Sequence, residues 1–434
     1  MPGGRRLLSV VGQRSLTGPL RVLEYVHRCA SAERHGQTFA MGTYHSAAML
    51  RPADGDGDAR LHTFGRGFHG QLGRGAEFED SARPVTVRAF EKCVSVVAVH
   101  CGGSHCAVVR DAAGGPEVHT WGLASSGELG HGGWTPIEVC RPRLVASLTL
   151  RVRVRAVSTG SNHTLVVGTC GGLWACGRGR HGQTGLGHFF DSGDLQKVDA
   201  LKSVCVTSVA AGGAHSLALT STGDVWSWGD ARSGQLGQGP GVIALDGGAM
   251  PVPQLVALPW WCASDPVVKV VAGGHHSFML TLSGKLLACG RGRHGALGRG
   301  CLADLSFPEH IPARCEAACA LCHHDSIAMV VAVSAGRDHT MALTTCGAVL
   351  ATGCNSYGAL GTGDMVRRTT FTRVHGLPRV VAIQAGEHHS AAASDDGRLF
   401  TWGRGDRGQL GHGETRSSGR PTELAGWRLT FASA

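Results

Sequence analysis

The sequence lacks the features that mark membrane, secreted and nucleic-acid-binding proteins. No uninterrupted apolar run reaches the roughly 18 residues of a transmembrane helix, and no basic run reaches about five residues. No secretory cleavage signal is evident, and many of the 16 cysteines stand inside apolar, strand-like segments. We therefore expect free, buried thiols in a reducing compartment, no membrane span and no dedicated nucleic-acid tail.

Motifs of common enzyme classes are also missing. There is no nucleophile elbow or P-loop in the context that each requires. The G-x-G-x-x-G fragments, such as Gly177–Gly182, are not followed by a helical pattern. With 16 prolines and 42% apolar residues the chain is neither collagen-like nor disordered. We expect a folded protein that is not an enzyme and carries no cofactor.

Glycine is abundant, at 66 of 434 residues, about twice its usual share, and its spacing reveals a repeat. One glycine recurs in seven copies, each followed by further glycines 5, 8 and 10 residues later, and each preceded by the motif Gly-x-x-His. The first glycines of the copies are Gly65, Gly122, Gly177, Gly229, Gly290, Gly353 and Gly403. The motif histidines are His45, His105, His163, His215, His276, His339 and His389.

Each repeat has the pattern of four short strands. In the last copy these are Val380–Gln384, Ser390–Ala393, Leu399–Trp402 and a strand around Pro421–Leu424, with turn residues between them. Evenly spaced short strands in seven copies predict an all-β fold, a seven-bladed β-propeller with four-stranded blades. We place it at residues 37–434.

These repeats resemble those of the regulator of chromosome condensation family over roughly residues 37–434. The resemblance implies a ring that is closed by strands from both chain termini. Thr38–Gly42 and Trp427–Ala434 each match part of a first strand. We therefore expect the two ends to complete one shared blade, which removes the open edges of the ring.

Histidine and cysteine offer two candidate metal sites. Recurrence of the seven motif histidines at one position favours a structural role over a metal or catalytic ring; we expect each to cap a strand and bond to backbone of its own blade. Cys319–His323 reads C-x-x-C-H, the pattern of haem attachment, and Cys315, Cys319, Cys322 and His323 could also bind zinc. A partly buried thiol cluster is favoured over both, and no metal is expected.

The founding member of the family exchanges guanine nucleotides on a Ran-type small GTPase, through acids in Gly-x-x-His loops beside a wedge-like insertion. Gly241–Leu245 resembles that wedge, but His275 and Gly213 stand where the family has the acids. The resemblance therefore disfavours Ran exchange. In the plant UV-B photoreceptor these loops carry tryptophans, which are absent here, so light sensing is excluded.

We expect a scaffold that binds other proteins within a larger intracellular assembly, cytoplasmic or cytoskeletal (including flagellar). The alternatives are a Ran-type exchange factor or a mitochondrial family member acting on ribosome or GTPase partners. The most divergent loops are the expected contacts, including the insertions 240–266 and 301–328. The candidate protein-binding residues are Arg337, Asp338, Glu387 and His388 on one face, with Trp260 and Trp261 as an anchor. Packing of this tryptophan pair against the flank of the propeller is the alternative to a role in binding.

Residues 1–36 lie outside the repeats and are rich in arginine and poor in acids. That profile suits a mitochondrial transit peptide, and it also suits a basic arm that lies along an acidic partner. We favour a retained arm ordered by a neighbouring protein.

Overall fold

The computed structural model describes most of the chain. The described residues are 37–54, 57–75, 78–91, 95–133, 138–149, 152–243, 247–313 and 329–430. The predicted basic arm at 1–36 and the C-x-x-C-H cluster of Cys315, Cys319, Cys322 and His323 lie outside them.

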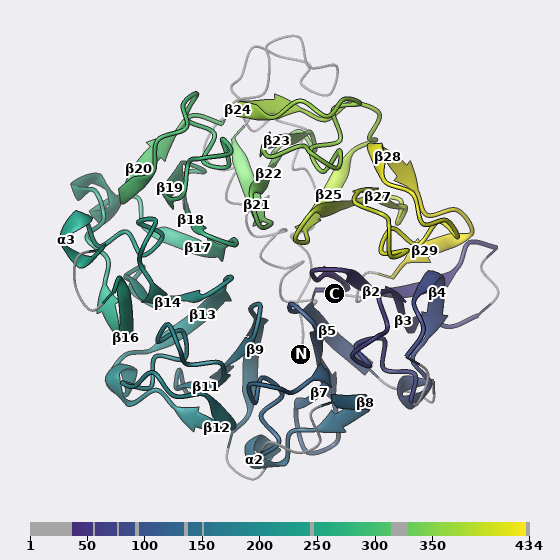
Figure 1. The fold of residues 1–434 in the computed structure, drawn as a ribbon, viewed down its shortest axis with the longest axis horizontal. Helices are drawn as coiled ribbons and strands as arrows, with labels where there is room; N and C mark the ends of the chain where they lie inside the picture. Colours follow the sequence, from purple (N-terminus) through teal and green to yellow (C-terminus); the bar gives the residue numbers. More distant parts are fainter. Residues whose placement is uncertain are drawn as a thin grey trace, which may run out of the picture.

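Seven antiparallel sheets surround a central axis, as the sequence predicts (Figure 1). The first blade contains β1 (Phe39–Met41), β2 (His45–Pro52), β3 (Arg60–Gly65), β4 (Ser81–Thr86) and β29 (Trp427–Leu429); the second contains β5 (Ser95–Cys101), β6 (His105–Asp111), β7 (Glu117–Leu123) and β8 (Glu138–Leu144). The third contains β9 (Val154–Thr159), β10 (His163–Gly168), β11 (Leu173–Gly177) and β12 (Ser192–Lys197); the fourth contains β13 (Val206–Ala211), β14 (His215–Thr220), β15 (Val225–Asp230) and β16 (Ala249–Leu255).

The other three blades follow the same order. The fifth contains β17 (Val267–Ala272), β18 (His276–Thr281), β19 (Leu286–Gly290) and β20 (Leu305–Ile311); the sixth contains β21 (Val330–Ala335), β22 (His339–Thr344), β23 (Val349–Gly353) and β24 (Arg368–Arg373). The seventh contains β25 (Val380–Ala385), β26 (His389–Ser394), β27 (Leu399–Gly403) and β28 (Ser418–Glu423). Helical turns among the described residues are short: η1 (Arg88–Phe90), α2 (Ala146–Thr149), η2 (Asp199–Leu201), α3 (Pro240–Ile243) and η3 (Trp260–Ala263).

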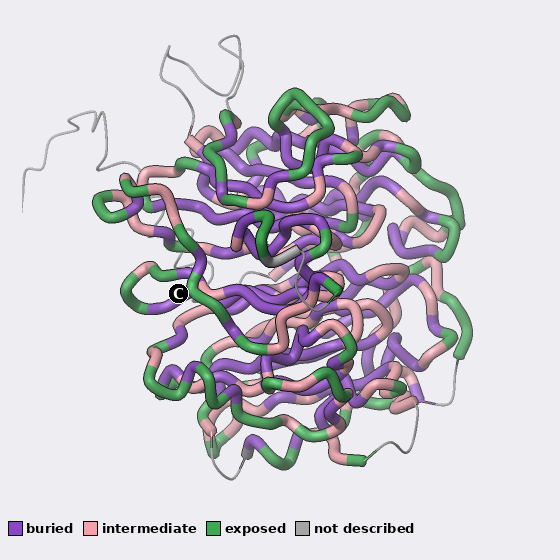
Figure 2. The backbone as a smooth tube through the Cα atoms, turned by 60° about the vertical axis from the view of Figure 1, so that its left-hand side comes forward, coloured by how far each residue is buried: buried purple, intermediate pink, exposed green. Residues whose placement is uncertain are grey.

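Burial follows the position of a strand in its blade. The second strand of the fourth blade, β14, is buried along its whole length, because its alternate side chains pack into two different apolar clusters. The outermost strand of the third blade, β12, has exposed residues among its partly buried ones. Figure 2 shows the same division, with buried backbone through the body of the ring and exposed backbone at many of the turns. The core is therefore a series of apolar layers between blades.

The ring is closed by both termini, as predicted. β1 and β29 pair with the same side of β2, one after the other. Met41 is opposite Ser46 in the first pairing, and Leu429 is opposite Leu50 in the second. Two short segments from opposite chain ends therefore take the place of one inner strand.

The repeated glycines allow backbone and side chains of adjacent blades to approach closely. Gly185 has φ +74°, and a Cβ atom there would lie 2.8 Å from Nε1 of Trp228 in the next blade. That indole is fully buried and donates to the carbonyl of Gln183 at 2.9 Å. A side chain at 185 would therefore both strain the turn and displace the tryptophan.

The motif histidines join the blades to one another, which corrects the expected bond to backbone of the same blade. His215 Nε2, for example, lies 2.9 Å from Oγ of Ser277 in the following blade, and this hydroxyl donates to the carbonyl of Gln235 at 2.7 Å. Because that donation uses the only hydroxyl hydrogen, Nε2 carries the proton and donates to Ser277. Burial lowers the pKa of His215 to about 3, so the ring stays neutral. The expected partner, backbone of the same blade, was therefore wrong.

Candidate protein-binding face

The seven Gly-x-x-His loops form one face of the propeller, here called the loop face. Backbone N–H groups of one loop donate to carbonyls of the next around the ring, as from Arg337 to Glu387 at 3.1 Å. The third strand of each blade contains the first glycine of its repeat, and the backbone N–H of the residue after this glycine donates to a carbonyl of the loop in the same blade. In the seventh blade, Arg404 follows Gly403 and donates to the carbonyl of His388 at 2.9 Å. The loop face therefore consists of the two inner residues of each loop together with these following residues, which are Arg66, Leu123, Arg178, Asp230, Arg291, Cys354 and Arg404.

Four predicted residues of the loop face come together at the junction of the sixth and seventh blades. Arg337 forms an ion pair with Glu387 across the junction, and its Nε lies 3.6 Å from a carboxylate oxygen of Asp338. His388 Nε2 lies 3.8 Å from the carboxylate of Glu387. Burial lowers the pKa of His388, whereas Glu387 opposes this shift. The four residues form one charged cluster.

Next to that cluster lies a row of alternating aromatic rings and arginines, here called the arginine–aromatic ladder. It consists of Tyr357, Arg404, Tyr44, Arg66 and Phe68 and crosses the sixth, seventh and first blades. The guanidinium of Arg404 lies 4.7 Å from the ring of Tyr357 and 4.9 Å from the ring of Tyr44. Arg66 lies 5.6 Å from the rings of both Tyr44 and Phe68. These distances are within the range of cation–π attraction.

The ladder is held in place and remains accessible. Asp406 accepts two hydrogen bonds from Arg404, at 2.9 and 2.7 Å, which fixes the plane of the guanidinium. Phe68 is 60% exposed and Tyr357 is 37% exposed. The ladder was not predicted from the sequence, although the chain has only three tyrosines and two of them lie here. That scarcity is the one sequence signal that could have revealed it.

The predicted anchor, Trp260 and Trp261, lies on the opposite face. Both belong to η3, before β17, and the ring of Trp261 lies 4.5 Å from Nζ of Lys285 in the turn between β18 and β19. That turn is at the other end of β18 from its Gly-x-x-His loop. Trp261 packs against the fifth-blade core, whereas Trp260 is 88% exposed. The pair and the charged cluster are therefore two separate surfaces, and a role for Trp260 at an interface stays a prediction.

The segment that resembles the family's wedge begins as the short helix α3 at the outer edge of the ring (Figure 1). Its last residues, 244 and 245, lie outside the described part of the chain. At Gly213 a Cβ atom would lie 2.5 Å from the carbonyl oxygen of Gly274. The acid that the family carries there does not fit this backbone without a shift.

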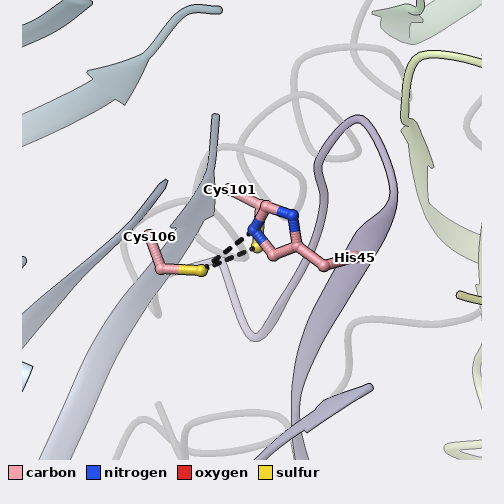
Figure 3. A group of neighbouring side chains, drawn as sticks. All are labelled: His45, Cys101 and Cys106. Carbon is pink, nitrogen blue, oxygen red and sulfur yellow. Dashed lines mark hydrogen bonds between the residues drawn. The ribbon is translucent and has the colours of Figure 1, made fainter. Parts of the chain in front are cut away.

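A group of potential metal ligands occurs within the described residues at the junction of the first and second blades. The side chains of His45, Cys101 and Cys106 point toward one another (Figure 3). His45 Nε2 lies 3.1 Å from Sγ of Cys106, and the two sulfur atoms are 3.7 Å apart. Burial raises the pKa of the Cys106 thiol. Burial acts to raise the pKa of Cys101 as well, but the hydrogen bond with Cys106 and the nearby His45 outweigh it and lower this pKa to about 6.

Comparison with known proteins gives the family of the chain. The model of the RCC1-like domain matches residues 60–434. The chain belongs to this family. The solved structure of Prp20p from Saccharomyces cerevisiae superposes with a TM-score of 0.70, at 21% identity, over 88% of this chain and 87% of that one. The likeness shows the same fold.

Three similar relatives have names that point to different roles or locations. The ultraviolet-B receptor UVR8 of Arabidopsis thaliana is 33% identical over 74% of this chain and 66% of its own length. The mitochondrial protein RUG3 of the same plant is 32% identical over 63% of this chain and 57% of its own. The secretion-regulating guanine nucleotide exchange factor of Mus musculus is 31% identical over 70% of this chain and 61% of its own length. The chain therefore spans less than two thirds of the length of these relatives.

In the described part of the chain, helices are too short to cross a membrane.

Proposed function

We propose that this RCC1-like propeller is a non-catalytic protein-binding subunit, and that its partner docks on the loop face over the arginine–aromatic ladder. The ladder is the observation that carries the proposal. Tyrosine and arginine dominate the binding energy of protein interfaces. Here they are already held in one geometry by stacking and by Asp406, so little side-chain freedom is lost on binding.

The charge of the loop face supports a partner with an acidic surface. Near the ladder, arginines are balanced by Glu387, Asp338 and Asp406. The third and fifth blades add Arg178, Arg180 and Arg293, which form no ion pair with the described residues. An acidic surface would be attracted to these arginines and oriented over the face, which raises the rate and specificity of association.

The test compares two faces of the same full-length protein. Affinity purification with mass spectrometry is carried out with the unchanged protein, with a Tyr44→Ala, Arg404→Ala double variant, and with Trp260→Ala as the control on the opposite face. We expect a partner that is retained by Trp260→Ala and lost by the double variant. Each interface residue of this kind contributes about 2 kcal/mol, so affinity for the identified partner should fall at least about 30-fold.

Equal retention of every partner by the double variant would show that the ladder is not the binding site. Loss of a partner with Trp260→Ala alone would move the site to the opposite face. Thermal unfolding of the three proteins should agree closely, because the ladder lies at the surface. That comparison separates lost binding from lost folding.

The alternative, nucleotide exchange on a Ran-type GTPase, is supported by the name of one relative. The absence of acids at His275 and Gly213 opposes it. Release of fluorescent GDP from such a GTPase should therefore not be accelerated by the purified protein. Acceleration would favour the exchange function over a simple scaffold.

A mitochondrial location is the second alternative, since RUG3 is named as mitochondrial. We propose that residues 1–36 are retained and contact a neighbouring subunit in an intracellular assembly. Peptide mapping of the native protein distinguishes the two. An intact N-terminus supports the retained arm, and a mature start between residues 15 and 36 supports import.

A further inference from the structure

The junction of the first and second blades departs from the other six. At those six, the motif histidine meets a serine or threonine hydroxyl of the next blade, as His163 meets Ser216. Here His45 meets the thiol of Cys106. The residue of β5 that lies opposite Cys106 of β6 is also a cysteine, Cys101. In the other blades it is Met41, Thr159, Ala211, Ala272, Ala335 and Ala385.

Repeats preserve residues that the scaffold needs, and a hydroxyl satisfies the scaffold in six blades. The two thiols and one imidazole at the junction of the first and second blades therefore need another explanation. Within the part of the chain that the structure describes, this junction alone places two sulfur atoms and a histidine nitrogen within 4.8 Å of one another.

The spacing matches that of ligands on one tetrahedral ion. Two thiolates bound at about 2.3 Å with a tetrahedral angle have sulfur atoms about 3.8 Å apart, and here they are 3.7 Å apart. A thiolate and an imidazole on the same ion are about 3.6 Å apart, and His45 Nε2 lies 3.1 Å from Cys106 Sγ. Small movements of the side chains would complete the geometry.

We propose that His45, Cys101 and Cys106 form a three-ligand Zn²⁺ site that ties the first blade to the second. Two thiolates and an imidazole are the donors that Zn²⁺ prefers, and such a set disfavours Mg²⁺ and Ca²⁺. This inference replaces the expectation, made from the sequence, that no metal is bound. It does not depend on the proposed docking of a partner at the loop face.

A route for the ion leads from the central channel of the propeller. The channel has a volume of about 1080 Å³, and Cys101 and Gly102 line it. Cys101 is half-buried, whereas His45 and Cys106 are fully buried. Cys101 is therefore the first ligand that an entering ion meets, and solvent from the channel supplies the fourth ligand.

Zn²⁺ binding changes the protonation of the ligands. Both sulfur atoms bind Zn²⁺ as thiolates, so Cys106 must lose its proton on binding, and His45 binds through Nε2 with its proton on Nδ1. Loss of the Cys106 proton removes its hydrogen bond to the carbonyl of Gln71, but Trp121 Nε1 still donates to that carbonyl at 2.9 Å. The Nδ1 atom of His45 is buried without a hydrogen-bond partner among the described residues. We therefore expect weaker binding than in zinc sites where a second residue orients the histidine.

The test uses two variants that restore what other blades already contain. Cys106→Ser supplies the hydroxyl of the regular junctions, and Cys101→Ala supplies the alanine found in four blades, so both should fold. Full-length protein is stripped with a chelator under reducing conditions and titrated with Zn²⁺ against a chromophoric indicator. Each variant should bind one equivalent fewer than the unchanged protein, with at least 100-fold weaker binding at this site. Cys289→Ser, which changes a buried thiol elsewhere, should bind as the unchanged protein does.

A second measurement identifies the ligands. Co²⁺ in place of Zn²⁺ should give thiolate-to-metal charge-transfer absorption that both variants reduce, and that Cys289→Ser leaves unchanged. Equal stoichiometry and affinity in all proteins would overturn the proposal, because the metal would then bind at other cysteines. A Cys101–Cys106 disulfide in the native protein, or binding of Cu⁺ but not Zn²⁺, would overturn it as well.

Discussion

Replacing Leu429 by alanine tests whether the C-terminal segment holds the ring closed. Leu429 is the last residue of β29 and pairs with Leu50 of the first blade. Its backbone N–H donates to the carbonyl of Gly397 in the seventh blade at 2.8 Å. Its side chain is 3% exposed and packs in a cluster with Leu399 and Leu424. Leu429 therefore contacts both the first and the seventh blade at the point where the ring closes.

The expected loss follows from this burial. Truncating a fully buried leucine to alanine removes apolar contacts and leaves a cavity, which together cost about 3 kcal/mol. The unfolding entropy is about 2.1 cal/mol/K per residue, or about 0.8 to 0.9 kcal/mol/K for a propeller of this length. The Tm should therefore fall by about 3 to 4 °C. The midpoint in urea should fall as well, with little change of the m-value.

The control makes the same substitution at an exposed position. Leu302 is 40% exposed, so Leu302→Ala should change the free energy of unfolding by no more than about 0.5 kcal/mol. Both variants are measured by calorimetry and by urea unfolding followed by tryptophan fluorescence. If Leu429→Ala were as stable as Leu302→Ala, the pairing of β29 with β2 would contribute nothing to closure, and our explanation of the ring would be refuted.

Two further predictions concern the junctions between blades. Ser277→Ala removes the hydroxyl between His215 and the carbonyl of Gln235, so the free energy of unfolding should fall by about 1 to 3 kcal/mol. The control, Ser221→Ala at an exposed position, should leave it nearly unchanged. Equal free energies of unfolding for the two variants would show that the hydrogen bonds of Ser277 add no stability. Burial raises the pKa of Glu128 to about 7, so the folded state holds its proton above the unfolded value of 4.5 and stability declines as pH rises from about 4.5 to 7. Glutamine stands at this position in four other blades. Between pH 5 and 8, Glu128→Gln should therefore become more stable relative to the unchanged protein by up to about 3 kcal/mol. If the difference in unfolding free energy between the two proteins, measured in urea, did not change with pH, the carboxyl of Glu128 would not be buried and protonated.

The number of blades and the positions of their strands were predictable from the sequence. Both depend on local features: glycines at fixed offsets, β-branched runs, and a turn between them. Closure of the ring was implied by the resemblance to the family, and Thr38–Gly42 and Trp427–Ala434 fit it because each carries part of a strand pattern. The observed β1 and β29 lie within these segments.

The candidate binding surface could be predicted only in part. Arg337, Asp338, Glu387 and His388 stood out because their loops diverge from the repeat, and the structure brings them together. The anchor pair also diverges from the repeat, but divergence does not reveal the face on which a residue lies. The structure places Trp260 and Trp261 at the opposite end of their blade from the loop face.

Contacts between blades were decided by the tertiary structure alone. Tyr44 and Arg404 are 360 positions apart in the chain and meet only because the seventh blade closes against the first. The partners of the motif histidines are likewise in the following blade, so a pattern within one repeat pointed to the wrong bond. The cluster of His45, Cys101 and Cys106 has the same origin. A repeat determines each blade from nearby residues, whereas the arrangement of blades around the axis determines which side chains share a site.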